Sequence, residues 1–207
     1  MSARQILLDD ELINSLNMEE YADNAYRQTI AETPVLQSDS AKERRRREIS
    51  YLNIRWFMAT LLDRMDRTSM YNGLEARVPF ADHRIVEYVF NVPWDMKCAG
   101  GVTKGLLRHA AAGLLPDNVL WRKKSPYPKT YDPYYEKMLA GKLREVISDT
   151  ASPIRTLLDI AKVNRFIEAP SDYGRPWYGQ LMAGPQMLAY MLQVNYWLSE
   201  YNISIEY

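Results

Sequence analysis

The feature that most constrains the fold of this chain is a long run of apolar residues at helical spacing. The run begins at Ser40, and Glu43 follows three residues later, which is the pattern of a capping box. Apolar side chains then recur every three or four residues, which predicts one long amphipathic helix that frays near Thr68. Its apolar side is expected to consist of Ile49, Leu52, Trp56, Ala59, Leu62 and Met65.

Caps and prolines divide the rest of the chain into further helices of the same kind. Residues before Asn17 are expected to be irregular, and only residues 203–207 have the pattern of a short strand. Pro185 lies within the last apolar run and should either kink that helix or mark its start. We therefore predict an all-α fold. Further helix starts are expected at Asn17, Asp82, Thr103, Asp132 and Ser152, with Pro116 as the end of the helix that begins at Thr103.

Composition limits the class of protein. The 207 residues suffice for one domain or a large part of one. The formal net charge is zero, so no global field favours nucleic acid or an acidic membrane. Cys98 is a lone cysteine, and the sequence shows neither a signal peptide nor a long apolar run, so we predict a cytoplasmic chain. The 15 tyrosines and 5 tryptophans either fill a helical core or form a surface that packs against another domain.

Most motifs of common catalytic sites are absent from the sequence. It contains no GxxxxGK[ST] phosphate loop, no GxGxxG after a strand and no GxSxG nucleophile turn. Cys98, His83 and His109 lie too far apart for a zinc site, so no metal site is predicted. The basic run Arg44–Arg47 is either a phosphate or nucleic-acid patch or a solvated helix face. We favour the solvated face, because the chain is neutral and cations are unfavourable near a helix start.

Two charged groups remain as candidates for chemistry. In the first, Glu75 and Arg77 either form a structural ion pair, which Asp82 could join, or Glu75 lines a cleft where it accepts a proton or holds an ammonium group. In the second, Arg122–Lys124 either form an exposed basic loop or position a lysine that neutralises phosphate charge during a reaction. Pro126 and nearby Pro128 would stiffen that loop, which favours a positioned cation.

Short motifs follow one another in a distinctive order from the end of the long helix onwards. The motifs are Asp66–Met70, Leu74–Asp82, Lys104–Arg108, Leu115–Pro116 and Arg122–Lys124. Their order and spacing resemble the C-terminal part of the synthetase domain of glutamine-dependent asparagine synthetases, with the core of the resemblance over residues 50–130. Residues 131–207, the expected C-terminal helices, resemble one bacterial branch more loosely. We therefore interpret residues 1–207 as the C-terminal portion of an asparagine synthase domain.

The resemblance implies a specific reaction. Members of this family use Mg-ATP to activate the side-chain carboxylate of aspartate as an acyl-adenylate with release of pyrophosphate, and ammonia released from glutamine in a separate N-terminal domain then attacks. By resemblance, Glu75 lies at the acceptor side of the cleft and Lys124 stabilises charge at the adenylate and pyrophosphate. Arg77 and Lys123 are weaker candidates for substrate binding, and Arg77 and Asp82 also match residues that we interpret as structural supports.

The chain also departs from the family pattern. Position 2 is Ser2, where the glutaminase half would have its nucleophilic cysteine, and neither S-G-G-x-D-S nor S-G-E-G-S-D-E is present. We therefore expect the helical C-terminal portion of an α/β ATP-pyrophosphatase-type domain, without its parallel-sheet half. Such a chain should be inactive alone, bind no cofactor alone, and have the upstream synthetase and glutaminase domains, or a second copy, as partners. The alternatives are a non-catalytic interaction module and a related synthetase that forms another amide or a β-lactam.

Overall fold

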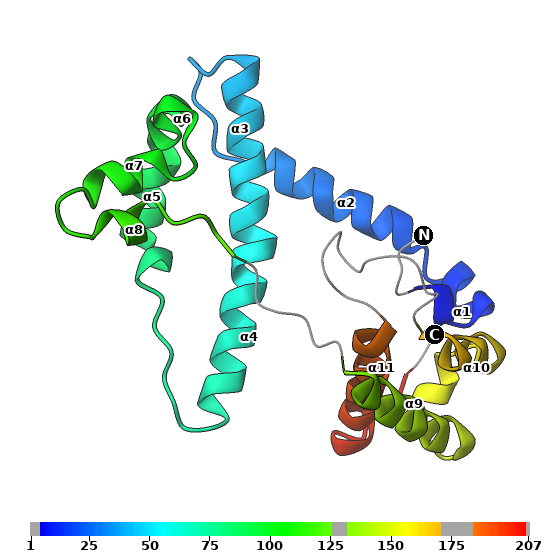
Figure 1. Ribbon diagram of the computed structural model, residues 1–207. Coiled ribbons are helices and arrows are strands. Elements are labelled where there is room, and N and C mark those ends of the chain that lie inside the picture. Colours follow the sequence, from blue (N-terminus) through cyan, green and yellow to red (C-terminus); the bar gives the residue numbers. More distant parts are fainter. Residues whose placement is uncertain (1–4, 126–131, 171–183, 206–207) are drawn as a thin grey trace. The chain divides into compact units, whose positions relative to one another are not determined.

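The computed structural model of the chain describes residues 5–125, 132–170 and 184–205 (Figure 1). Within these ranges every regular element is a helix, and the β-type pairing consists of isolated bridges alone, which confirms the predicted all-α fold. The strand expected at residues 203–207 is wrong for residues 203–205, which lie in irregular structure after the last helix, and residues 206–207 lie outside the described part.

The chain divides into two compact units, which we describe separately. Residues Met1–Tyr21 and Pro126–Tyr207 form the first, here named the terminal unit, and residues Ala22–Ser125 form the second, named the central unit. Helix α2, Met18–Ala31, crosses the boundary. Its start at Met18 confirms the helix predicted after Asn17, whose side-chain amide donates a hydrogen bond to the carboxylate of Glu20.

The terminal unit contains helical elements that the sequence did not predict, among them the one before Asn17. The segment before Asn17 is helical in part, because the Asp9 carboxylate accepts hydrogen bonds from the amides of Glu11 and Leu12 at 2.9 and 3.1 Å and so caps a short helix. Asp132 caps its helix as predicted, whereas the helix after Ser152 is a single 3-10 turn. The elements are η1 Gln5–Leu7, α1 Asp10–Ser15, α9 Pro133–Ser148, η5 Pro153–Thr156, α10 Ile160–Glu168 and α11 Gly184–Glu200.

A conventional apolar core holds the terminal unit together. Helices α9 and α11 pack side by side, and Leu143 and Leu188, one from each helix, are fully buried. The N-terminal segment joins this core through buried Leu7 and through a hydrogen bond of 3.1 Å from the Asp159 amide to the Leu7 carbonyl oxygen. The core residues are Leu7, Leu139, Ala140, Leu143, Ile147, Ile154, Leu158, Val163, Phe166, Ile167, Met187, Leu188, Met191 and Leu198.

Pro185 lies in the first described turn of α11, which spans Gly184–Glu200. Residues 171–183 lie outside the described part, so the choice between a kink at Pro185 and a helix start there stays a prediction. A Cβ atom at Gly184 would overlap the carbonyl group of Pro170, so glycine is the residue that lets the two backbones approach.

The central unit is built around the predicted long helix. Ser40 and Glu43 form the predicted capping box, and the helix continues to Met70 with one π-helical segment in its middle. The helix expected between Thr103 and Pro116 is shorter than predicted. It begins at Gly105, because Lys104 adopts a left-handed backbone conformation with φ 60°, and a second short helix follows Pro116. The elements are α3 Ala41–Leu52, η2 Asn53–Met58, α4 Ala59–Met70, η3 Pro79–Ala81, α5 His83–Asn91, α6 Trp94–Lys97, η4 Ala99–Gly101, α7 Gly105–Ala110 and α8 Asp117–Leu120.

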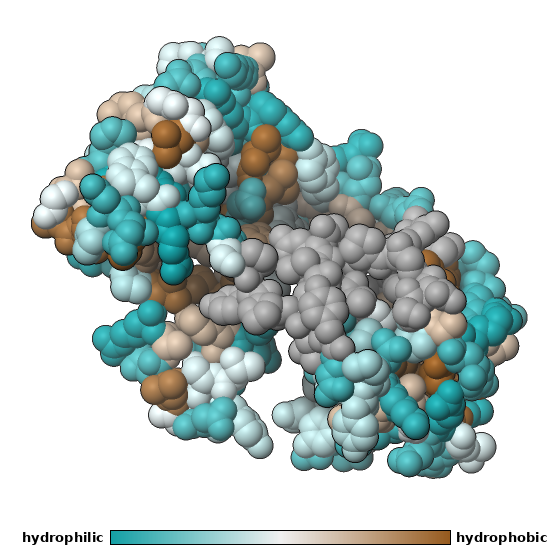
Figure 2. Space-filling view, viewed as in Figure 1, coloured by the Kyte–Doolittle hydropathy of each residue, from teal (hydrophilic) through white to brown (hydrophobic). Residues whose placement is uncertain are grey.

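The apolar side of the long helix lacks a matching apolar surface within the described chain. None of the residues of α3, η2 and α4 is buried, and Ile49 and Trp56 are exposed. Across residues 22–125, which are all described, the buried residues are Thr29, Thr33, Gly105 and Leu120. Figure 2 shows hydrophobic side chains, in brown, at the surface of this part of the molecule. The sequence therefore predicted the helix correctly but not an apolar core beside it.

Candidate functional site

Glu75 and Arg77 lie in the irregular segment between α4 and η3. The Arg77 guanidinium donates hydrogen bonds to both carboxylate oxygens of Glu75, each of 3.1 Å. Both side chains are exposed, at 62% for Glu75 and 81% for Arg77. The ion pair that the sequence allowed is therefore formed, with its two charges on the surface. The role of Glu75 towards a ligand stays a prediction.

Asp82 pairs with a different arginine from the one expected. Its carboxylate accepts hydrogen bonds from the Arg84 amide at 2.9 Å and from the Arg84 guanidinium at 2.7 and 3.0 Å, so Asp82 caps α5 as predicted. The pKa of Asp82 is lowered to about 2, most strongly by the guanidinium of Arg84 and next by the backbone amide of the same residue. The proposed link to Arg77 is wrong, because the cap position directs the carboxylate towards the start of its own helix.

A cleft of about 380 Å³ lies on the other side of the Glu75 segment, against α4. Ala76 and Val78 line this cleft, while Glu75 and Arg77 between and beside them do not. The acidic groups that line it are Asp63 and Asp66 of α4. Asp66 belongs to the D-R-x-S-M motif, so the motif was a sequence signal for this acidic position.

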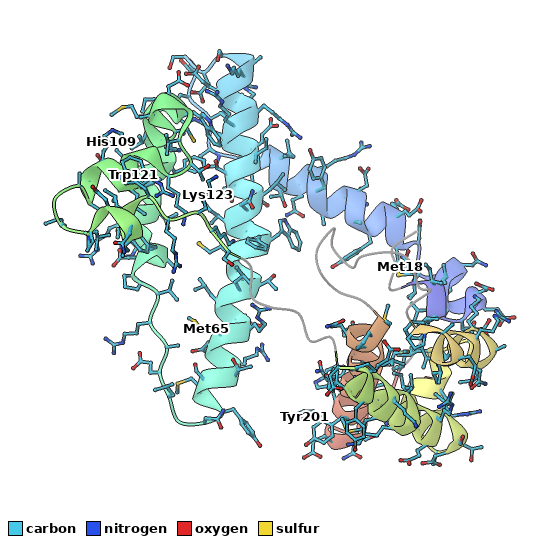
Figure 3. The ribbon with its side chains drawn as sticks, in the orientation of Figure 1. Met18, Met65, His109, Trp121, Lys123 and Tyr201 are labelled. Carbon is cyan, nitrogen blue, oxygen red and sulfur yellow. The ribbon has the colours of Figure 1, made fainter. Side chains whose placement is uncertain are left out.

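The lysines of the second candidate group follow α8. Residues 122–125 are exposed and irregular, and Figure 3 shows Lys123 on the segment that leads from α8 towards the long helix, where Met65 is labelled. Among the described residues, the ammonium groups of Lys123 and Lys124 form neither a hydrogen bond nor an ion pair, and Glu75 is therefore not a partner of either lysine. The two ammonium groups are therefore available to an anion. Pro126 and Pro128, which were expected to stiffen the loop, lie outside the described residues.

Arg108 anchors the segment that carries these lysines, and the sequence reading assigned it no role. Its guanidinium donates hydrogen bonds to the carbonyl oxygens of Thr103 at 3.0 Å, Leu120, and Arg122 at 3.4 Å. The guanidinium carbon also lies 5.6 Å from the centre of the Trp121 ring. Arg108 is the last residue of the K-x-x-L-R motif, and that motif was the only sequence pattern that pointed to it. Its hydrogen-bond acceptors are backbone atoms, which no pattern of side chains reveals.

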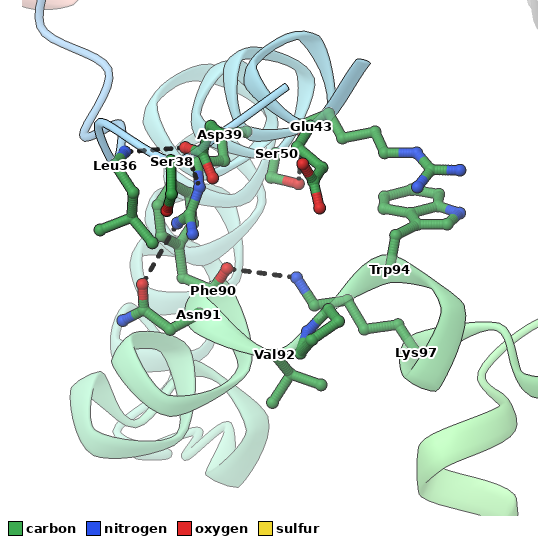
Figure 4. Close-up of a pocket in the computed structure, with 13 residues that line it drawn as sticks. Leu36, Ser38, Asp39, Glu43, Ser50, Phe90, Asn91, Val92, Trp94 and Lys97 are labelled. Carbon is green, nitrogen blue, oxygen red and sulfur yellow. Dashed lines mark hydrogen bonds and ion pairs between the residues drawn. The ribbon is translucent and has the colours of Figure 1, made fainter. Parts of the chain in front are cut away.

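Arg46 and Arg47 of the basic run line a second cleft, of about 210 Å³ (Figure 4). Arg47 donates to Asp39 at 2.8 Å and to Asn91 at 3.2 Å, and its guanidinium carbon lies 5.3 Å from the centre of the Phe90 ring. Arg46 stacks on Trp94 at 5.2 Å in the same way. The expectation of a solvated helix face is therefore wrong for these two arginines, because they hold the α5–α6 region on α3.

The described residues offer cations that suit phosphate groups but no larger cluster of metal ligands. The lysines of the Arg122–Lys124 segment suit phosphate charge, and in the described ranges no group of three or more His, Cys, Asp or Glu side chains could hold a metal ion. Among the same residues, none of the helices combines the length and the apolar composition that a bilayer crossing requires.

Comparison with known sequences gives one consistent result. The sequence model of the family described as "Asparagine synthase" matches residues 1–199 of the chain. The chain is 47% identical over 201 residues to "Asparagine synthetase [glutamine-hydrolyzing] 3" of Bacillus subtilis (strain 168), a match that covers 97% of this chain and 33% of that protein. It is 45% identical over 67 residues to the corresponding synthetase of Mus musculus, which covers 31% of this chain and 12% of that protein. The chain thus spans about a third of the length of the Bacillus subtilis relative.

Proposed function

The chain belongs to the asparagine synthase family, and we propose that it supplies part of the synthetase site of an ATP-dependent, glutamine-hydrolysing asparagine synthetase. The observation that carries this proposal is the match to the Bacillus subtilis synthetase, which extends over nearly the whole chain. That breadth supports the synthetase reading over a non-catalytic interaction module. The substrates would be aspartate, ATP and glutamine, and the reaction would take place in the cytoplasm.

Lys124 has the central role in this proposal. Its exposed ammonium group would lie near the phosphates of ATP, which supplies the adenylate and the pyrophosphate leaving group. A positive charge at that position is most useful when negative charge develops on the departing pyrophosphate. Lys123 would assist substrate binding as a second, less specific cation. Neither lysine has a competing partner among the described residues, which supports this assignment.

Glu75 would act at the acceptor side of the same site, where aspartate and ammonia meet. In the structure its carboxylate is held by Arg77 through two hydrogen bonds of 3.1 Å. The two hydrogen bonds orient the carboxylate, which suits a group that supports proton removal from the attacking ammonia. Arg77 would then orient Glu75, and would bind substrate only as a secondary contact. The upstream synthetase and glutaminase domains, and a second copy of the chain, are the proposed protein partners.

A chimaeric enzyme tests the function directly. This chain replaces the aligned third of the Bacillus subtilis synthetase, and aspartate-dependent exchange of pyrophosphate into ATP is measured together with asparagine formation. The chimaera is expected to be active and this chain alone inactive. A folded chimaera without exchange activity, or clear exchange by the chain alone, would contradict the proposal.

Lys124→Ala in the chimaera tests the assignment of the site. Loss of one group that stabilises developing charge should lower kcat by about 10²–10³-fold. Lys142→Ala is the matched control, since Lys142 is also an exposed lysine but lies on α9 in the terminal unit. An unchanged kcat in Lys124→Ala would remove Lys124 from the mechanism while leaving the family membership intact.

A further inference from the structure

We propose that Arg108 is a positioning residue that holds the Arg122–Lys124 segment, and with it the two lysines, at a fixed place in the central unit. This inference rests on the proposed function for its catalytic consequence, but its structural part stands on contacts within the chain. The reaction outlined above gives Arg108 no role, and its guanidinium donates to backbone carbonyl groups.

The contacts of Arg108 connect three successive parts of the chain. Its Nε donates to Thr103 before α7, one terminal nitrogen donates to Leu120 at the end of α8, and the other donates to Arg122. Its guanidinium carbon lies 5.6 Å from the Trp121 ring, next to two of these acceptors in sequence. All three nitrogens of the guanidinium are therefore used in one connection between α7 and the segment after α8.

Few other interactions hold α7, α8 and the segment that follows them in place. Helices α7 and α8 have only six and four residues, so neither is stable by itself. Leu120 is the single large apolar side chain that is buried in residues 22–125. The last described backbone hydrogen bond before the lysines runs from the Arg122 amide to the Val119 carbonyl oxygen, at 3.3 Å. The Arg122 carbonyl group that Arg108 binds is thus the final anchor before Lys123.

The geometry requires arginine. A guanidinium presents its donors in a planar, rigid fork and stacks on an aromatic ring, whereas an ammonium group is a compact point charge on a flexible chain. Lysine at position 108 would keep the positive charge and the aliphatic stem, but it could not reach the three carbonyl groups together. A lysine that must meet a phosphate group gains from such anchoring, because a displacement of about 1 Å can lower a rate by about 100-fold.

Limited trypsin digestion of this chain tests the structural part. Cleavage after Arg122, Lys123 and Lys124 is expected to be about tenfold faster in Arg108→Lys and Arg108→Met than in the wild type, because the segment opens more often. Arg27→Met is the matched control, since Arg27 forms a single exposed ion pair with Asp23 within α2. Far-UV circular dichroism checks that each variant keeps its helices, and Arg108→Lys serves as the test if Arg108→Met does not. Equal cleavage rates in Arg108→Lys and the wild type would overturn the proposal.

Kinetics of the chimaera test the catalytic part. Arg108→Lys is expected to lower kcat by about 10- to 100-fold with little change in the KM for ATP. In the Lys124→Ala background the same substitution should have almost no further effect, because the lysine that it positions is gone. The same loss in both backgrounds would overturn the positioning role. An inactive chimaera would refute the proposed function instead, and the digestion would still decide whether Arg108 anchors the segment.

Discussion

The terminal unit and the central unit are built from the same kind of helix, yet different interactions hold them together. In the described part of the terminal unit, fourteen buried residues form an apolar core. In the central unit Leu120 is the only large apolar side chain buried among residues 22–125, while Trp56, Phe57 and Phe80 are among its exposed side chains. Arginine contacts take the place of the core there, with Arg47 and Arg108 at their centres. Helical periodicity therefore indicates an apolar face, but a core forms only where the chain supplies a second apolar face to cover it.

The proposed function accounts for this difference. A chain that spans a third of a synthetase should bury the apolar faces whose partners lie within that third and expose the others. The terminal unit contains both members of its main helix pair, α9 and α11, whereas the long helix of the central unit has one exposed apolar side. The comparison predicts that core substitutions affect the terminal unit most and that charge substitutions affect the central unit most.

Leu143→Ala should give the largest loss of stability in the molecule. Leu143 is fully buried between α9 and α11, so its truncation leaves a cavity and should cost the terminal unit about 4 kcal/mol. Native-state hydrogen exchange of the α9 amides measures this loss separately from the central unit. Met138→Ala on the same helix is the control, because Met138 is exposed and should cost less than about 1 kcal/mol. Equal losses from the two substitutions would show that the apolar core does not hold this unit.

Arg47→Met should give the largest loss in the central unit. The side chains of Arg47 and Asp39 are only 13% and 7% exposed, so removal of the arginine leaves a nearly buried carboxylate and should cost about 3 kcal/mol. Hydrogen exchange of α3 and α5 should report the loss, with no change in α9. The double variant Arg47→Met/Asp39→Asn should recover much of it, since no uncompensated charge remains.

The control for Arg47 is its neighbour Arg44. Arg44 belongs to the same basic run but is exposed, so Arg44→Met should change the free energy of unfolding by less than about 0.5 kcal/mol. If both substitutions had the same small effect, the basic run would be the solvated helix face that the sequence indicated, and the contrast between the units would lose its explanation.

These differences mark what the sequence could predict. The caps at Ser40, Asp82 and Asp132 were predicted correctly, because a cap depends on residues within one turn. The partner of Arg47 at Asn91 is 44 positions away, and spacing carries no signal at that distance. The role of Arg108 was hidden for a different reason, since its acceptors are carbonyl oxygens that every residue possesses.

For the candidate site, the motif order named Glu75 and Lys124 as candidates, because motifs are local, and their roles stay predictions. The sequence also allowed the ion pair of Glu75 with Arg77 that the structure shows. It did not reveal that Ala76 and Val78 face the cleft against α4 while Glu75 lies outside its lining. That distinction depends on how the segment packs on a helix, and only the three-dimensional arrangement provides it.

The smallest expected effect concerns the pKa values of two helix caps, one from each unit. Asp82 caps α5 in the central unit, and its pKa of about 2 lies below the ordinary 3.8 mainly because of the Arg84 side chain. Asp159 caps α10 in the terminal unit, and its pKa is lowered chiefly by the backbone amide of Lys162. Because both pKa values are depressed in the folded state, each carboxylate stabilises the fold above pH 4 and loses that contribution as the pH falls towards the folded pKa.

Carboxyl NMR titration of the two caps separates side-chain from backbone control. Arg84→Met should move the pKa of Asp82 well back towards 3.8, since the guanidinium that lowers it most is removed, although the amide hydrogen bond of 2.9 Å keeps part of the shift. Lys162→Met should leave most of the shift of Asp159, because the amide at position 162 still donates its hydrogen bond of 2.9 Å. Equal responses at the two caps would mean that arginine side chains contribute no more to the central unit than backbone caps do. The contrast would then rest on Arg47 and Arg108 alone.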